Sequence, residues 1–192
     1  MTYFFDGKIL AGYVVIYAAL ILLYGIRRKK TELPLYAAAG ILFGIYLYFV
    51  IRITQFPIMQ SDGMEEALGG NIWRSISLIP FRDIAGRTNL YNIILTVPMG
   101  FFVPLLCRKR MKKAGKILLF LLPGFLIELS QLFQLLVIGY TLRVIDVNDL
   151  ICNAAGTVIG YFIFRAVRSG ISILYSKGKQ KKGHFAEYFM RR

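Results

Sequence analysis

Long apolar stretches separated by short polar or basic segments make up most of this chain. Five stretches approach the roughly 20 residues that an α-helix needs to cross the hydrocarbon core of a bilayer; they lie at about residues 9–26, 35–53, 91–107, 117–138 and 150–167. Because lipid offers the backbone no hydrogen-bond partners, helices are the expected spanning elements. The pattern therefore predicts an all-α, polytopic membrane bundle of about five transmembrane helices.

Composition and charge support the same class. Of the 192 residues, 57% are hydrophobic and only 18% are charged, whereas soluble domains have about 25% charged residues. The mean hydropathy is +0.58. The net charge is +14, but the basic residues occur in short runs between apolar stretches. A nucleic-acid-binding surface needs one continuous basic face, so no nucleic-acid partner is expected.

The distribution of Lys and Arg predicts the orientation in the membrane. Eighteen of the 24 basic residues fall at 27–30, at 108–116, or in the C-terminal part from Arg165 onward. Such clusters mark the cytoplasmic side of a membrane protein. With five spans, all three clusters agree on one topology, in which the N-terminus lies outside and the C-terminus is cytoplasmic.

This topology divides the chain into four parts. Residues 1–56 hold two scaffold helices, residues 57–90 form an extracytoplasmic loop with an interfacial segment, residues 91–167 hold three core helices, and residues 168–192 form a basic cytoplasmic tail. The lone Trp73 and the mixed polarity around it suit a segment lying at the membrane surface. An ordinary surface loop with a Trp anchor and a re-entrant or active-site cap both remain open.

Few residues could support metal or nucleophilic chemistry. Cys107 and Cys152 lie in or beside apolar stretches, and the sequence contains no CxxC or Cys/His spacing. The single histidine, His184, lies in the basic tail. A zinc site, a disulfide framework and a Ser-His-Asp mechanism are therefore not expected. We expect no cofactor, no metal site and, because basic residues follow the first stretch at 27–30, no cleavable signal.

The fourth stretch contains polar residues that an apolar span should not contain. Glu128 lies near its middle, where a carboxylate costs a few kcal/mol on insertion scales. Gln131 follows three residues later on the same helical face, and Gln134 extends the polar stripe. The fourth stretch therefore presents a polar face to the other helices.

The fifth stretch opens with a second polar stripe. Asp146, Asp149 and Asn153 are spaced three and four apart, so a helix places them on one face. Arg143 lies three residues before Asp146 and is a candidate ion-pair partner. Gly156 and the following Gly160 have the small-xxx-small spacing that lets membrane helices approach closely.

In the predicted topology, these stripes and the outer end of the third stretch reach a similar depth on the outer side. The set predicts an outward-facing polar pocket whose ligand-binding residues are Asn92, Glu128, Gln131, Arg143, Asp146, Asp149 and Asn153. The alternative is that these groups only hold helices together, each contributing about 0.6 kcal/mol. For Asn92 or Gln131 alone, the two interpretations carry equal weight. For the remaining five residues taken together, Glu128, Arg143, Asp146, Asp149 and Asn153, we favour a functional pocket.

Four stretches of this region carry a family resemblance. They read SLIPF at 77–81, NIILTVPMGFFVP at 92–104, ELSQ at 128–131, and RVIDVNDLICNAAG at 143–156. In these stretches the chain resembles the VanZ-like family of bacterial membrane proteins, over about residues 71–165. The resemblance implies a multi-pass protein of the bacterial cell membrane that acts at its outer face.

The resemblance also implies a role. The family name comes from resistance to teicoplanin, so the expected function is glycopeptide resistance or handling of envelope lipid precursors. The expected partners are the bilayer and a lipid-linked cell-wall precursor or lipoglycopeptide. An alternative is an enzyme that modifies a lipid head group, with catalytic candidates Glu128, Asp146 and Asp149 as acid/base or metal groups. A small transporter is disfavoured because the spans show no internal repeat.

Overall fold

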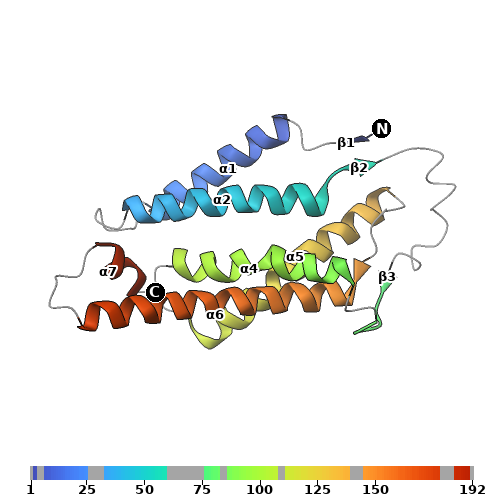
Figure 1. Ribbon diagram of the computed structural model, residues 1–192. Coiled ribbons are helices and arrows are strands. Elements are labelled where there is room, and N and C mark those ends of the chain that lie inside the picture. The colour runs from blue at the N-terminus through green and yellow to red at the C-terminus, as the bar shows by residue number, and fades with distance from the viewer. Residues whose placement is uncertain are drawn as a thin grey trace.

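The computed structural model describes residues 2–3, 7–25, 33–59, 76–82, 86–107, 111–138, 145–177 and 184–190. Within these residues the helices are α1 (Gly7–Gly25), α2 (Leu33–Gln55), α4 (Arg87–Leu106), α5 (Lys113–Ile138), α6 (Val147–Lys177) and α7 (His184–Met190). The two-residue strands are β1 (Thr2–Tyr3), β2 (Ile58–Met59), β3 (Ile76–Ser77) and β4 (Ile145–Asp146). The long helices form a bundle, and the strands lie at one end of it (Figure 1). The all-α prediction is confirmed.

Four helices, α2, α4, α5 and α6, are long and apolar enough to cross a membrane, and α1 is a shorter apolar helix. Helices α2, α4 and α5 are each three or four residues longer than predicted, and α6 is much longer. Helix α4 has 20 residues because its first turn is built from the polar run that begins at Arg87. Helix α6 has 31 residues and ends at Lys177. Its basic residues do not end it, since long basic side chains extend towards water without breaking a helix.

Helices α4 and α6 lie side by side in direct backbone contact (Figure 1). A Cβ atom on Gly156 would collide with the carbonyl oxygen of Ile93, and one on Gly160 would collide with that of Val97. This close approach confirms the contact predicted from the spacing of the two glycines. Across the same interface, the Thr96 hydroxyl donates to the backbone oxygen of Asn153 at 2.8 Å.

Helix α5 joins this pair to α2. The Thr157 hydroxyl of α6 donates to the backbone oxygen of Phe120, in the first half of α5, at 3.1 Å. Near its end, Gln131 Nε2 donates to the backbone oxygen of Thr54 at 3.2 Å, and Gln134 Nε2 donates to Gln55 Oε1 at 2.8 Å. The polar stripe of α5 therefore faces the end of α2.

At the other end of the bundle, α7 packs against α4 and α6. Tyr188 is buried at 2% exposure, and its hydroxyl donates to the backbone oxygen of Leu105 at 3.1 Å. Arg168 Nη2 donates to the backbone oxygen of Met190 at 3.2 Å. Part of the segment predicted as a tail, residues 168–192, is thus a continuation of α6 and a short helix packed on the bundle.

The helix ends separate into two groups. The end of α2, the start of α4, the end of α5 and the start of α6 lie at the strand end of the bundle (Figure 1). The described basic residues of the second and third clusters, such as Lys116 and Arg165, lie towards the opposite end. These described residues thus lie away from the strand end, and the membrane topology, including the outward orientation of that end, stays a prediction.

Candidate functional site

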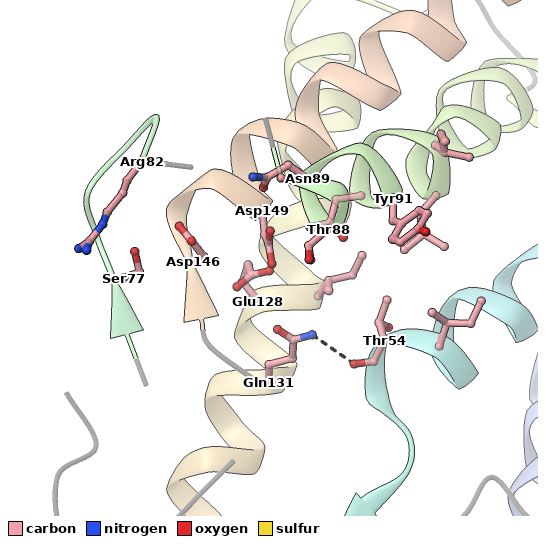
Figure 2. Close-up of a pocket in the computed structure, with 16 residues that line it drawn as sticks. Thr54, Ser77, Arg82, Thr88, Asn89, Tyr91, Glu128, Gln131, Asp146 and Asp149 are labelled. Carbon is pink, nitrogen blue, oxygen red and sulfur yellow. Dashed lines mark hydrogen bonds between the residues drawn. The ribbon is translucent and has the colours of Figure 1, made fainter. Parts of the chain in front are cut away.

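A pocket of about 930 Å³ opens at the strand end of the bundle (Figure 2). Its walls come from the end of α2, β3 with the segment after it, the start of α4, the second half of α5, and β4 with the start of α6. The polar side chains that line it are Thr54, Ser77, Arg82, Thr88, Asn89, Tyr91, Asn92, Glu128, Gln131, Asp146 and Asp149. Five elements distant in the sequence therefore meet around one polar space.

The structure brings five of the seven predicted site residues to this pocket: Asn92, Glu128, Gln131, Asp146 and Asp149. Asn153 does not line it. Its side chain lies one helical turn further along α6, at 1% exposure, with its Cβ atom beside Gly124 of α5. Arg143 lies outside the described residues, so its ion pair with Asp146 stays a prediction.

The carboxyl groups gather where α5 meets the start of α6. Glu128 lies near Asp149, and near both the backbone and the side chain of Asp146. In Figure 2 the carboxyl oxygens of Glu128 and Asp149 point into the same space, and Arg82 lies at its edge beyond Asp146. Like charges gathered in a low-dielectric site are unfavourable unless a proton, a cation or a hydrogen-bond donor compensates them. The cluster is therefore suited to a ligand that supplies donors.

Asp146 has a structural role in addition to its place in the pocket. Its Oδ1 accepts the backbone N–H of Asn148 at 2.8 Å, two residues on. This is the bond that an N-cap residue makes to the first turn of a helix. Asp146 therefore holds the start of α6, and with it Asp149, in position against Glu128.

Buried polar atoms without partners lie beside the carboxyl cluster. Within the described part of the chain, Asn92 Nδ2, Glu128 Oε2 and, one turn further along α6, Asn153 Oδ1 are buried without a close hydrogen-bond partner, although the Asn92 amide lies beside the Asp149 carboxyl group. A buried polar group of this kind is costly unless water or a ligand satisfies it. Asn92 Nδ2 is a hydrogen-bond donor, and the Glu128 carboxyl group can accept a hydrogen bond. The site is therefore equipped to bind a group that both accepts and donates, such as a hydroxyl or an amide.

Asn148 holds a second segment against the pocket. It is fully buried, at 0% exposure; its Oδ1 accepts the Phe81 N–H at 2.6 Å, and its Nδ2 donates to the Arg82 oxygen at 2.8 Å. Phe81 has a φ of 66°, a left-handed conformation that is strained for a bulky residue. Both bonds hold the backbone in this turn, and they carry Arg82 to the pocket edge. Parallel pairing of Ser77 with Asp146 adds to this anchoring.

Asn148, Asn89 and Arg82 are not among the residues predicted from the sequence. Asn148 falls off the face shared by Asp146, Asp149 and Asn153, so the helical spacing alone removes it from the predicted pocket. The resemblance marks both segments, since residues 77–81 and 143–156 carry it, but only the structure shows that Asn148 joins them.

Among the residues that the structure describes, no group of three or more His, Cys, Asp or Glu side chains is placed to hold a metal ion. The chemistry that the pocket itself offers is hydrogen bonding by amides and hydroxyls, and proton exchange by carboxyl groups.

The fold and the pocket define an α-helical membrane protein with a polar site at one end of its bundle. The family model described as VanZ/LLP1 matches residues 43–168, about two thirds of the chain, and the chain belongs to this family. The match confirms the resemblance and extends it towards the N-terminus, into α2. It includes every described element of the pocket. Comparisons with curated proteins and with solved structures yield no match.

Proposed function

We propose that this VanZ-like protein acts at the outer face of the bacterial cell membrane, in resistance to teicoplanin-type glycopeptides or in handling lipid-linked envelope precursors. The observation that carries the proposal is the pocket itself. In an apolar bundle, polar side chains from distant elements converge on one space, and Glu128 Oε2 is buried there without a hydrogen-bond partner among the described residues. Intramembrane polar groups in such an arrangement mark functional sites.

The pocket position supports action at the outer leaflet. It lies at the end of the bundle away from Lys116 and Arg165, which belong to clusters that the charge rule assigns to the cytoplasm. A ligand reaching it would approach from the outer face of the membrane, where glycopeptides meet their lipid-linked targets.

The rim of the pocket supports an amphiphilic ligand. Three lining side chains on α2 and α4 are more than half exposed: Ile53 at 57%, Tyr91 at 64% and Ile94 at 58%. Beside β3, Leu78, Ile79 and Phe81 are exposed at 71%, 57% and 66%. Such an apolar rim suits contact with the bilayer interface. We infer that a polar head group binds among the carboxyl and amide groups while its lipid tail stays in the membrane.

Drug susceptibility tests the resistance proposal. A glycopeptide-susceptible bacterium would express the wild-type protein, Asp149→Asn, or Glu187→Gln as a matched carboxylate control in α7, at the far end of the bundle. We expect the wild type and the control to raise the inhibitory concentration of an acyl-bearing glycopeptide more than that of one without an acyl chain. Asp149→Asn should lose this protection at equal membrane abundance. Unchanged susceptibility with the wild type would remove the resistance proposal.

A second candidate is an enzyme that modifies a lipid head group. The observation that favours it is the proximity of the Glu128 and Asp149 carboxyl groups, which could pass a proton to and from a bound substrate. Lipid analysis of cells that express the wild type or Glu128→Gln tests it. A lipid that changes only with the wild type supports the enzyme, and identical profiles reject it.

A further inference from the structure

The end of the bundle opposite the pocket holds a convergence of basic side chains from two helices. The Lys116 ammonium group of α5 lies 5.7 Å from the ring centroid of Tyr161 of α6, within the range of a cation–π contact. Arg165 follows Tyr161 by one helical turn, and the side chains of Lys116 and Arg165 both lie beside the Tyr161 hydroxyl. Two positive charges from different helices therefore share one tyrosine.

These charges have no acidic residue nearby in the sequence to balance them. No Asp or Glu occurs between Asp83 and Glu128, or between Asp149 and Glu187. Lys112 and the adjacent Lys113, both exposed at the start of α5, add further positive charge. Like charges that the fold brings together at a membrane interface repel each other, and a bound anion relieves that repulsion.

The surface beside this basic group is apolar. The Phe120 ring packs edge-on against Tyr161, with centroids 5.6 Å apart. The sequence neighbours of Lys116 and Tyr161 are exposed apolar residues, Ile117 at 50% and Phe162 at 65%. A phosphate held by the basic group would thus leave its acyl chains beside an apolar surface. A soluble anion would gain nothing from that surface, and this favours a lipid.

We propose that Lys116, Tyr161 and Arg165 form a binding site for the phosphate group of an anionic phospholipid. Lys116 and Arg165 supply the charge, and the Tyr161 hydroxyl supplies a further hydrogen-bond donor. The proposal does not depend on the proposed function, because the site lies at the other end of the bundle from the pocket.

Native mass spectrometry of the full-length protein tests the site. The detergent-purified protein would be mixed with equal amounts of phosphatidylglycerol and phosphatidylcholine that carry the same acyl chains. We expect the wild type to retain severalfold more phosphatidylglycerol. The double variant Lys116→Gln, Arg165→Gln should lose this preference. Arg52→Gln is the matched control, because Arg52 also pairs with a tyrosine hydroxyl, that of Tyr48 at 3.4 Å, but lies near the end of α2, at the pocket end of the bundle; it should keep the preference.

A charge-preserving variant separates binding from folding. Lys116→Arg with Arg165→Lys should keep the lipid preference if charge at these positions is what binds. The proposal is overturned if the wild type retains both lipids equally, if the neutral double variant keeps the preference, or if the charge-preserving variant loses it while its thermal unfolding matches the wild type. Displacement of phosphatidylglycerol by millimolar inorganic phosphate would also overturn it, because the site would then select a soluble anion.

Discussion

The α4–α6 pair and the α1–α2 pair both use glycines four residues apart, but they pack differently. At Gly156 and Gly160 of α6, an added Cβ would strike backbone carbonyl oxygens of α4. At Gly40 and Gly44 of α2, it would meet only side chains, those of Ile21 and Tyr17. The same spacing therefore produces a contact between two backbones in one case and between a backbone and side chains in the other.

The difference follows from what lies opposite each glycine. In the α1–α2 pair, tyrosines fill the space above the glycines: the Tyr13 hydroxyl donates to the Gly44 oxygen at 2.5 Å, and the Tyr17 hydroxyl donates to the Gly40 oxygen at 2.7 Å. A ring can turn away, whereas a backbone carbonyl within a helix cannot. The α4–α6 pair is thus the more rigid support, and it carries Asn92 and Asp149 at its pocket end.

The largest effect is expected at Gly160. Gly160→Ala forces the α4 and α6 backbones apart, and we expect it to lower the free energy of unfolding by about 3 kcal/mol, at the upper end of overpacking costs. Thermal unfolding in detergent measures this. Gly170→Ala is the matched control in the same helix, because nothing lies within 4 Å of its added Cβ. Equal stability of the two variants would show that the backbone contact is not tight.

Asn148→Ala extends the comparison to the start of α6. The substitution removes two part-buried hydrogen bonds, to the Phe81 N–H and the Arg82 oxygen, and each lost bond costs about 1 kcal/mol. We expect faster hydrogen exchange at residues 76–82 than in the wild type, with the exchange of the α1–α2 pair unchanged. If residues 76–82 keep their protection, Asn148 does not hold this turn.

Gly44→Ala is expected to have a smaller effect. Its added Cβ meets the Tyr17 ring, which can rotate, so we expect a loss of about 1 kcal/mol. The measurement is the same thermal unfolding, run beside Gly160→Ala. A loss as large as that of Gly160→Ala would mean that the two pairs do not differ in rigidity.

The smallest effects are expected from removing single hydroxyl groups. Tyr17→Phe removes one bond to α2, and Thr96→Val removes one bond to α6; each should cost about 0.6 kcal/mol, the average for hydrogen bonds between membrane helices. Unfolding in a denaturing detergent can resolve such differences. A much larger cost for Thr96→Val would show that its hydroxyl also sets the spacing of α4 and α6.

Much of the site could be predicted because the residues that form it are periodic within single helices. Glu128 precedes Gln131 by one turn of α5, so this pair shares a face wherever the helix packs. Asp146 differs from the prediction, because it lies in β4 just before α6 and caps the turn that carries Asp149. Asn153 shows the limit of this argument. It lies on the same predicted face as Asp149, but one turn further along α6, where α4 and α5 close over it.

Asn148 and Arg82 could not be found in this way. Asn148 bonds to residues 67 and 66 positions away in the chain, and no local spacing indicates such a pair. The outward orientation of the pocket stays a prediction, as does the ion pair of Arg143 with Asp146, because Arg143 lies outside the described residues.

The sequence by itself determined the membrane class, the helical architecture and the family, because solubility in lipid depends on the local composition of each segment. Only the tertiary structure decided which polar residues line the pocket and which are packed between helices. It also decided that Asn148 holds the turn at Phe81 and that α4 meets α6 backbone to backbone. These features depend on contacts between segments distant in the chain, where one helical turn along α6 separates a pocket residue from a buried one.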